Sequence, residues 1–100
     1  MIFVYIACAD EKEAVKIAGQ LLKLRLIACA NIFPIKSFYR WKGKLVKDSE
    51  VVLLVKSAAK HYARIMRVVK GLHSYSVPCI LKLNAVADRE YENWMLGEMV

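Results

Sequence analysis

Two segments with helical periodicity constrain this sequence most, because each lies between strand-like runs. The first, 10–25, has apolar residues at i, i+3, i+4, i+7 and i+8, and Asp10 with Glu13 resembles a capping box at its start. The second, 62–71, has a similar apolar stripe and is expected to end at Gly71. The remaining segments predict strands at 2–7, 26–41, 44–56 and 79–86, followed by a short C-terminal helix capped by Asp88.

This order predicts an α/β chain of the α+β sandwich type, with a ferredoxin-like β-α-β-β-α-β arrangement and a short C-terminal helix. We expect one domain, 1–100, with an antiparallel sheet in the strand order 4-1-3-2 and both main helices on one face. Pro34 cannot donate to a strand ladder, so it indicates an edge, a bulge or a bend in the second strand.

The chain is 58% hydrophobic, more than 100 residues can bury, and the second sheet face has no predicted cover. Packing of sheets from several subunits would bury this surface, so an oligomer is expected.

A membrane span is not expected, because the longest uncharged stretch, Leu26 to Ile35, is too short and contains Asn31 and Pro34. The first ten residues lack the basic leader and the cleavage site of a signal peptide, which favours a cytoplasmic protein. An odd number of cysteines at wide spacings agrees with reduced thiols rather than a disulfide framework.

The net charge of +7 is concentrated between Lys36 and Lys70, where ten Lys or Arg residues face only Asp48 and Glu50. A solvated basic face is the simpler interpretation, and a site for an anion or nucleic acid is the alternative. Nucleic acid is disfavoured because recognition of RNA by such a sheet uses aromatic residues on both central strands, and 51–55 contains none.

Known catalytic sequence motifs are absent, and only two histidines exist. His61 is expected to be an ordinary surface residue, whereas His73 lies in a loop, where functional residues concentrate. The predicted topology places Cys8, Cys79 and His73 toward one end of the sheet, where they could bind Cu(I) or Zn(II); Cys29 could join only from a neighbouring subunit. The alternative is that each cysteine packs as a small apolar side chain.

Several spaced motifs give the chain a family resemblance over almost its whole length. They are 26–32 (LIACANI), 37–44 (SFYRWKGK), Glu50, 54–57 (LVKS), 73–78 (HSYSVP) and 91–94 (YENW). With these motifs the sequence resembles the CutA family of divalent-cation tolerance proteins.

The resemblance implies a homotrimer similar in architecture to the PII nitrogen-signalling proteins, with hairpins that reach onto neighbouring subunits. It also implies tolerance to copper and other divalent cations. Some members have proposed copper ligands near the positions of His73 and Cys8, which makes these two residues the candidate metal ligands. The family commonly has Pro at the position of Ser74, which predicts a less rigid His73 loop in this chain. The resemblance places the ligand cleft between subunits and assigns it Cys29, Tyr39, Trp41, Glu50, Lys56, His73 and Tyr75.

The sequence thus leads to the hypothesis of a non-enzymatic trimer that binds copper, another divalent metal or a small ligand between subunits and contributes to the response to metal ions. One alternative is an enzyme for a small anionic substrate, in which Lys56 holds the anion and Glu50 or His73 moves a proton. The other is a signalling module that binds a partner protein through its basic face.

Overall fold

The computed structural model describes all 100 residues, and its elements follow the predicted order. They are β1 (Ile2–Cys8), α1 (Glu11–Lys23), β2 (Cys29–Trp41), β3 (Lys44–Ser57), a 3-10 turn η1 (Ala59–His61), α2 (Tyr62–Leu72), β4 (Ile80–Asn84) and α3 (Arg89–Glu98).

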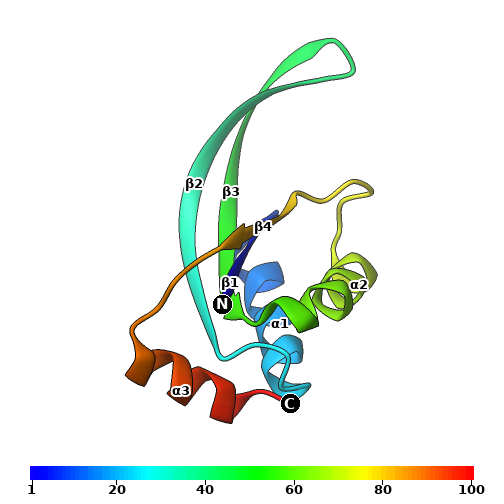
Figure 1. Ribbon diagram of the computed structural model, residues 1–100. Coiled ribbons are helices and arrows are strands. Elements are labelled where there is room, and N and C mark those ends of the chain that lie inside the picture. The colour runs from blue at the N-terminus through cyan, green and yellow to red at the C-terminus, as the bar shows by residue number, and fades with distance from the viewer.

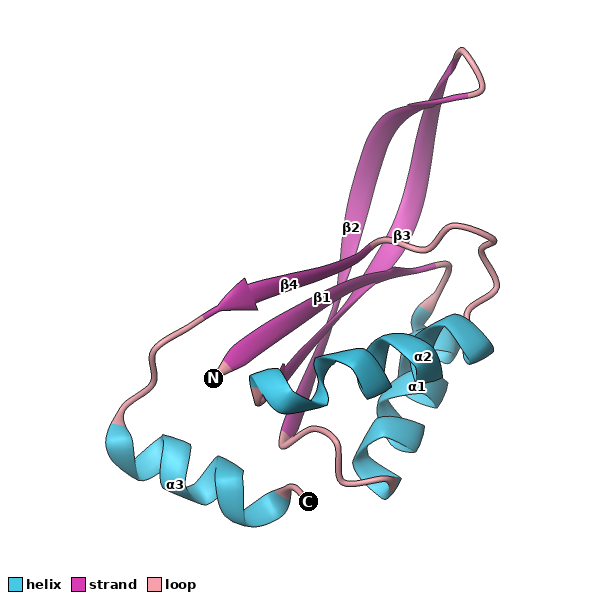
Figure 2. Cartoon of the chain, turned by 45° about the vertical axis from the view of Figure 1, so that its right-hand side comes forward, coloured by secondary structure: helices cyan, strands magenta, loops and turns pink.

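The four strands form one antiparallel sheet in the order β2-β3-β1-β4, as predicted. Helices α1 and α2 lie together on one face of this sheet, and α3 lies beyond its end (Figures 1 and 2). Strand β2 is an edge strand, which explains how it accommodates Pro34 opposite Val51. The ferredoxin-like α+β sandwich is therefore confirmed.

The hydrophobic core fills the space between the sheet and the two helices. Val4 and Ile6 of β1 are fully buried and lie opposite Val55 and Leu53 of β3, which are equally buried. Alternate residues along a strand point to opposite faces, so these four share the face that the helices cover. The helices contribute Ile17, Leu21, Ile65 and Val69, all with no exposed surface.

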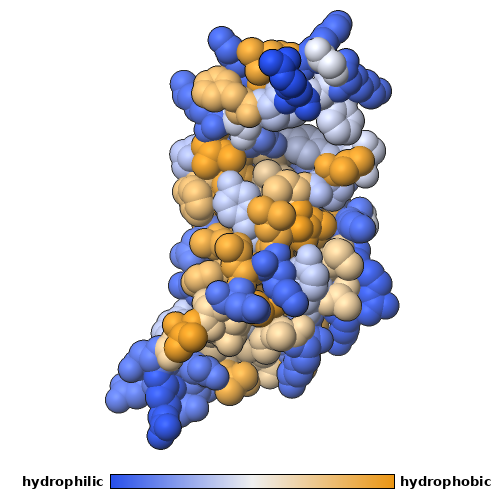
Figure 3. Space-filling view, turned by 45° about the horizontal axis from the view of Figure 1, so that its top comes forward, coloured by the Kyte–Doolittle hydropathy of each residue, from blue (hydrophilic) through white to orange (hydrophobic).

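The opposite face, which we call the open face, is also apolar but has no covering element. In the strand register, Leu81 lies opposite Tyr5 and Leu83 lies opposite Phe3. The two leucines are 52% and 48% exposed. Apolar side chains also gather over the middle of the molecular surface seen in Figure 3, with hydrophilic residues toward its ends. A monomer in water would leave this surface exposed, which is unfavourable.

The β2–β3 hairpin extends far beyond the rest of the sheet (Figure 1). Strand β1 pairs only with residues 51–57 of β3, so residues 44–50 pair with β2 alone. Lys42 and Gly43 form the turn with φ angles of 51° and 77°, the conformation of a two-residue hairpin turn that follows the strand twist. The molecule is consequently elongated, with extents of 45 × 24 × 21 Å.

Several predicted boundaries were wrong by a few residues. Helix α1 ends at Lys23 rather than near Arg25, because Arg25 adopts a left-handed conformation with φ of 58° that closes the helix. Helix α2 continues through Gly71 to Leu72, and β4 is shorter than predicted, ending at Asn84.

The placement of His61 at the surface was also wrong. This side chain is only 6% exposed, and its Nε2 atom forms a 2.8 Å hydrogen bond with the carbonyl of Val100. The contact spans 39 residues, so helical periodicity around His61 could not reveal it.

Glu13 joins two loops at the end of the sheet. The Asp10 side chain accepts a 2.8 Å hydrogen bond from the Glu13 N–H, as expected for an N-cap. The Glu13 carboxylate accepts from the N–H of Ala9 and from the N–H of Ser74, each at 2.9 Å. A proline at position 74 would lack this donor. The His73 loop is therefore fastened to the start of α1 by a contact that depends on Ser74 having an N–H.

Glu13→Gln should weaken the fold in a pH-dependent manner. Burial alone would raise the pKa of Glu13, but the hydrogen bonds from Ala9 and Ser74 lower this pKa below its ordinary value. Because the pKa of Glu13 is lower in the folded than in the unfolded state, its carboxylate stabilises the fold at pH values above the unfolded-state pKa. This stabilisation is lost as the pH falls through the folded-state pKa. At pH 6 the free energy of unfolding of the parent should exceed that of the variant by at least about 1.5 kcal/mol. This difference should shrink as the pH falls from about 5 to 3.

Urea unfolding with a chelator present, at fixed protein concentration, measures this difference. Glu11→Gln is the matched control, because Glu11 occupies the same first turn of α1 and is exposed. This role for the carboxylate would be contradicted if the loss of unfolding free energy in Glu13→Gln stayed constant from pH 6 to pH 3. It would also be contradicted if Glu11→Gln lost the same amount.

Candidate functional site

A cavity of about 430 Å³ opens on the open face, at the base of the hairpin. Ile35 pairs with Glu50 and Tyr39 with Val46, so odd-numbered residues of β2 share a face with even-numbered residues of β3. This register brings aromatic residues of β2 and acidic residues of β3 to one surface. The loop after α2 closes the cavity, whose main lining residues are Tyr39, Trp41, Asp48, Glu50, Tyr75 and Cys79.

Glu50 is the central charged group of this cleft. It is only 7% exposed and accepts a 2.9 Å hydrogen bond from the Tyr75 hydroxyl. Burial, together with the hydrogen bond to Glu50, raises the pKa of Tyr75 above its ordinary value, and burial and the Glu50 charge also raise the pKa of Cys79. Tyr75 and Cys79 therefore stay protonated near neutral pH, and the negative charge of the cleft resides on carboxylates.

His73 holds Tyr75 in place from behind the cleft. Its Nδ1 atom accepts a 3.0 Å hydrogen bond from the Tyr75 N–H, and its Nε2 atom lies 2.7 Å from the Ala7 carbonyl oxygen. A carbonyl can only accept, so this arrangement requires a neutral imidazole with its proton on Nε2. The His73 and Tyr75 rings are also in contact, with centroids 4.8 Å apart.

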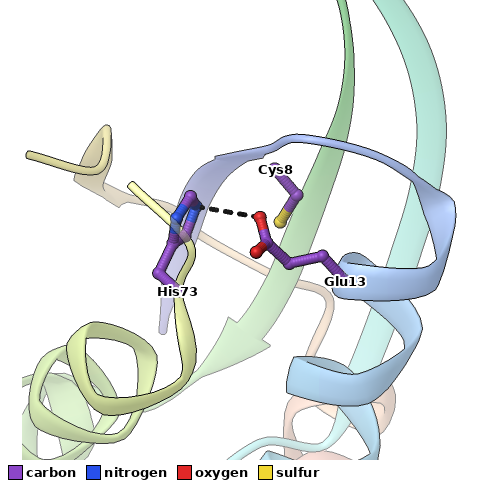
Figure 4. A group of neighbouring side chains, drawn as sticks. All are labelled: Cys8, Glu13 and His73. Carbon is purple, nitrogen blue, oxygen red and sulfur yellow. Dashed lines mark ion pairs between the residues drawn. The ribbon is translucent and has the colours of Figure 1, made fainter. Parts of the chain in front are cut away.

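Cys8, Glu13 and His73 form a compact cluster on the helix-covered side, and we call it the Cys8 cluster. Their potential ligand atoms all lie within 4.8 Å of one another, and the three side chains point toward a common space (Figure 4). The His73 Nε2 and Glu13 Oε1 atoms are 3.6 Å apart. Burial, followed by the charges of Glu13, Asp10 and Glu50, raises the pKa of the Cys8 thiol to about 12.

One chain brings together only part of the predicted ligand cleft. Tyr39, Trp41, Glu50 and Tyr75 line the cavity, and His73 supports Tyr75. Cys29 and Lys56 instead lie opposite each other at the far end of the hairpin strands. Lys56 is six residues from Glu50 along β3, which corresponds to roughly 20 Å.

Lys56 has its own partner at that far end of the sheet. Its Nζ atom donates to the Tyr91 hydroxyl at 3.5 Å and lies 5.4 Å from the centre of the Tyr91 ring. The alternative of an enzyme for an anionic substrate would require Lys56 beside Glu50 or His73. A single chain does not place Lys56 there.

Two residues of the site were missed by sequence reasoning. The sequence identifies Glu13 only as part of a capping box, and Asp48 only as one of two acids in a basic segment. The pairing of Ser37 with Asp48 would have placed Asp48 on the cleft face, once the hairpin register was known. Cys79, predicted near Cys8 and His73, lines the cavity instead of joining the Cys8 cluster.

No helix of the structure combines the length and the hydropathy needed to cross a membrane. The longest, α1, has 13 residues.

Comparisons with known proteins agree over nearly the whole chain. The divalent-cation tolerance protein CutA of Thermus thermophilus is 43% identical over 94 residues, which cover 92% of this chain and 91% of that protein. The corresponding protein of Archaeoglobus fulgidus is 39% identical over 94 residues, covering 93% and 92%.

Solved structures show the same fold. The crystal structure of CutA1 from Pyrococcus horikoshii superimposes with a TM-score of 0.96 at 35% identity and covers 100% of this chain and 99% of that chain. The Archaeoglobus fulgidus structure, described as a periplasmic divalent cation tolerance protein, has a TM-score of 0.95 at 38% identity and covers 98% of both chains.

The family described as CutA1 divalent ion tolerance protein matches residues 2–98. This is a family of divalent-cation tolerance proteins and not a family of enzymes. The match spans every strand and helix described above, and the chain belongs to the CutA1 divalent-ion tolerance family.

Proposed function

We propose that the chain forms a cytoplasmic homotrimer that binds copper or another divalent metal ion and contributes to the response to metal ions. The observation that carries the metal proposal is the Cys8 cluster, in which a thiol, a carboxylate and an imidazole converge within 4.8 Å. The reduced state of a cytoplasm suits the three cysteines, all of which are free thiols.

The trimer proposal is supported by the open face and by the hairpin. Leu81, Leu83 and their neighbours need cover that this chain does not supply. Residues 44–50 of β3 pair only with β2, and this part of the hairpin carries exposed Tyr39 and Trp41. Contact with neighbouring subunits would bury both surfaces, in an assembly similar to that of the PII proteins.

A trimer would also complete the predicted ligand cleft. Cys29 and Lys56 lie at one end of the hairpin strands, whereas Glu50 and Tyr75 lie nearer the other. We propose that the cleft forms between subunits, where the first group of one chain approaches the second group of another.

The donor atoms of the Cys8 cluster suit a soft or borderline metal such as Cu(I) or Zn(II). Cys8 would bind as a thiolate and His73 as a neutral imidazole, with Glu13 as the third ligand. Binding has to remove the proton from Cys8, whose pKa is near 12, and to displace the Ala7 carbonyl from His73. Metal affinity in the Cys8 cluster should therefore depend steeply on pH.

Analytical ultracentrifugation tests the trimer. The parent should sediment with three times the 11.4 kDa chain mass at micromolar concentration. Trp41→Ala should promote dissociation, because Trp41 is 49% exposed in the single chain and truncating a buried Trp typically loses about 3 to 5 kcal/mol. Phe38→Ala, on the opposite face of the same hairpin, is the comparison. A monomeric parent, or a Trp41→Ala trimer as tight as the parent, would refute this placement.

Metal titration under reducing conditions tests the Cys8 cluster. Copper and zinc affinity should rise between pH 5.5 and 8, by about tenfold per pH unit for each proton released. Cys8→Ser and His73→Ala should each lose this binding. Cys29→Ser should retain it, because the strand register places Cys29 on the open face and the Cys8 cluster lies on the helix-covered side. Circular dichroism should confirm that each variant is folded. A flat pH profile, or full affinity in folded Cys8→Ser, would show that the cluster does not bind metal.

A further inference from the structure

The cleft on the open face has a different chemistry from the Cys8 cluster. Its ionisable lining consists of the Asp48 and Glu50 carboxylates with the Tyr39, Tyr75 and Cys79 side chains, and it contains no Lys, Arg or His. The chain as a whole has 16 basic and 9 acidic residues. A negative cavity in a positive protein indicates that the cleft selects a cation.

The size of the cavity and the arrangement of its donors do not suit a bare metal ion. A volume of about 430 Å³ is within the range of pockets for small organic molecules. The three potential metal ligands that converge in this chain are those of the Cys8 cluster, and neither Asp48 nor Glu50 belongs to it. Two carboxylates without a third converging ligand leave a metal ion incompletely bound.

Three aromatic residues complete the wall of the cleft. Tyr39 is 39% and Trp41 is 49% exposed, so parts of both rings are accessible to a ligand. Tyr75 is held by its backbone to His73 and by its hydroxyl to Glu50, so its ring has a fixed position. Aromatic rings beside carboxylates are the groups that recognise organic ammonium ions, through cation–π attraction and charge.

We propose that this cleft binds a small organic ammonium ion, with its charge near Glu50 and Asp48 and its apolar part against Tyr39 and Trp41. The inference rests on the proposed ligand cleft and names the class of its ligand. It does not depend on the Cys8 cluster, which lies on the other face of the sheet. The lining residues Asp48 and Glu50 come from one chain. Their two carboxylates outnumber the single Lys56 that a neighbouring subunit would bring to the cleft, so the charge of the assembled cleft stays negative.

Isothermal titration calorimetry of the intact protein tests this proposal in phosphate buffer with EDTA, which excludes competing amines and metal ions. The probes are choline and isopentylamine, and their neutral counterparts are 3,3-dimethylbutan-1-ol and isopentanol. At least one cation should saturate with one site per chain and bind about tenfold or more tightly than its neutral counterpart.

Variants locate the site. Glu50→Gln should weaken the cation about tenfold or more, and Trp41→Leu should weaken it severalfold. Glu98→Gln removes the same charge from α3, far from the cleft, and should leave affinity unchanged. Sedimentation and circular dichroism should verify each variant; if Glu50→Gln does not assemble, Asp48→Asn, at an exposed position, replaces it.

The proposal is overturned if neither cation binds with a dissociation constant below about 10 mM. It is equally overturned if the alcohols bind as well as the cations, or if Glu50→Gln and Glu98→Gln have the same effect. Cys8→Ser distinguishes the two proposals, since it should abolish metal binding and leave ammonium binding intact. Retained ammonium binding without metal binding in the parent would refute only the metal proposal.

Discussion

The open face of the sheet is the constraint on which the rest of this structure depends. Two helices cover one face of the four strands, and 100 residues supply no third layer. Leu81 and Leu83 remain about half exposed beside Phe3 and Tyr5. Burying the exposed half of each leucine would contribute on the order of 1 kcal/mol, so cover by other copies of the chain gives a substantial gain. The same face carries the ligand cleft, so assembly and ligand binding would share one surface.

The cleft and the Cys8 cluster are linked by one loop. His73 belongs to the cluster, where its Nε2 atom lies 3.6 Å from Glu13, and its Nδ1 atom orients Tyr75. Tyr75 in turn donates to Glu50 on the other side of the sheet. The loop depends on the Ser74 N–H, which donates to Glu13. A proline at this position would restrict the backbone but would lack that donor. In this chain the hydrogen bond from the Ser74 N–H to Glu13 constrains the loop.

Sequence periodicity predicted the elements and their topology because both depend on local patterns of apolar residues. Tyr39 and Trp41 are two residues apart on one strand, so alternation places them on the same face. Glu13 and Ser74 are 61 residues apart, and His61 is buried by contact with Val100, so neither arrangement has a local signature. The role of Asp48 became apparent only with the hairpin register. Long-range contacts of polar side chains were therefore what the sequence left undetermined.

The most direct test of the central claim is an isotope-filtered nuclear Overhauser experiment on a mixed assembly. Chains with 13C-labelled leucine methyl groups would be refolded together with unlabelled chains, so that filtered signals arise only between subunits. The account predicts signals from the methyl groups of Leu81 and Leu83 to protons of unlabelled chains, and none from Leu22, which lies exposed on α1 on the other side of the sheet. An assembled protein in which Leu81 and Leu83 show no such signals would contradict it.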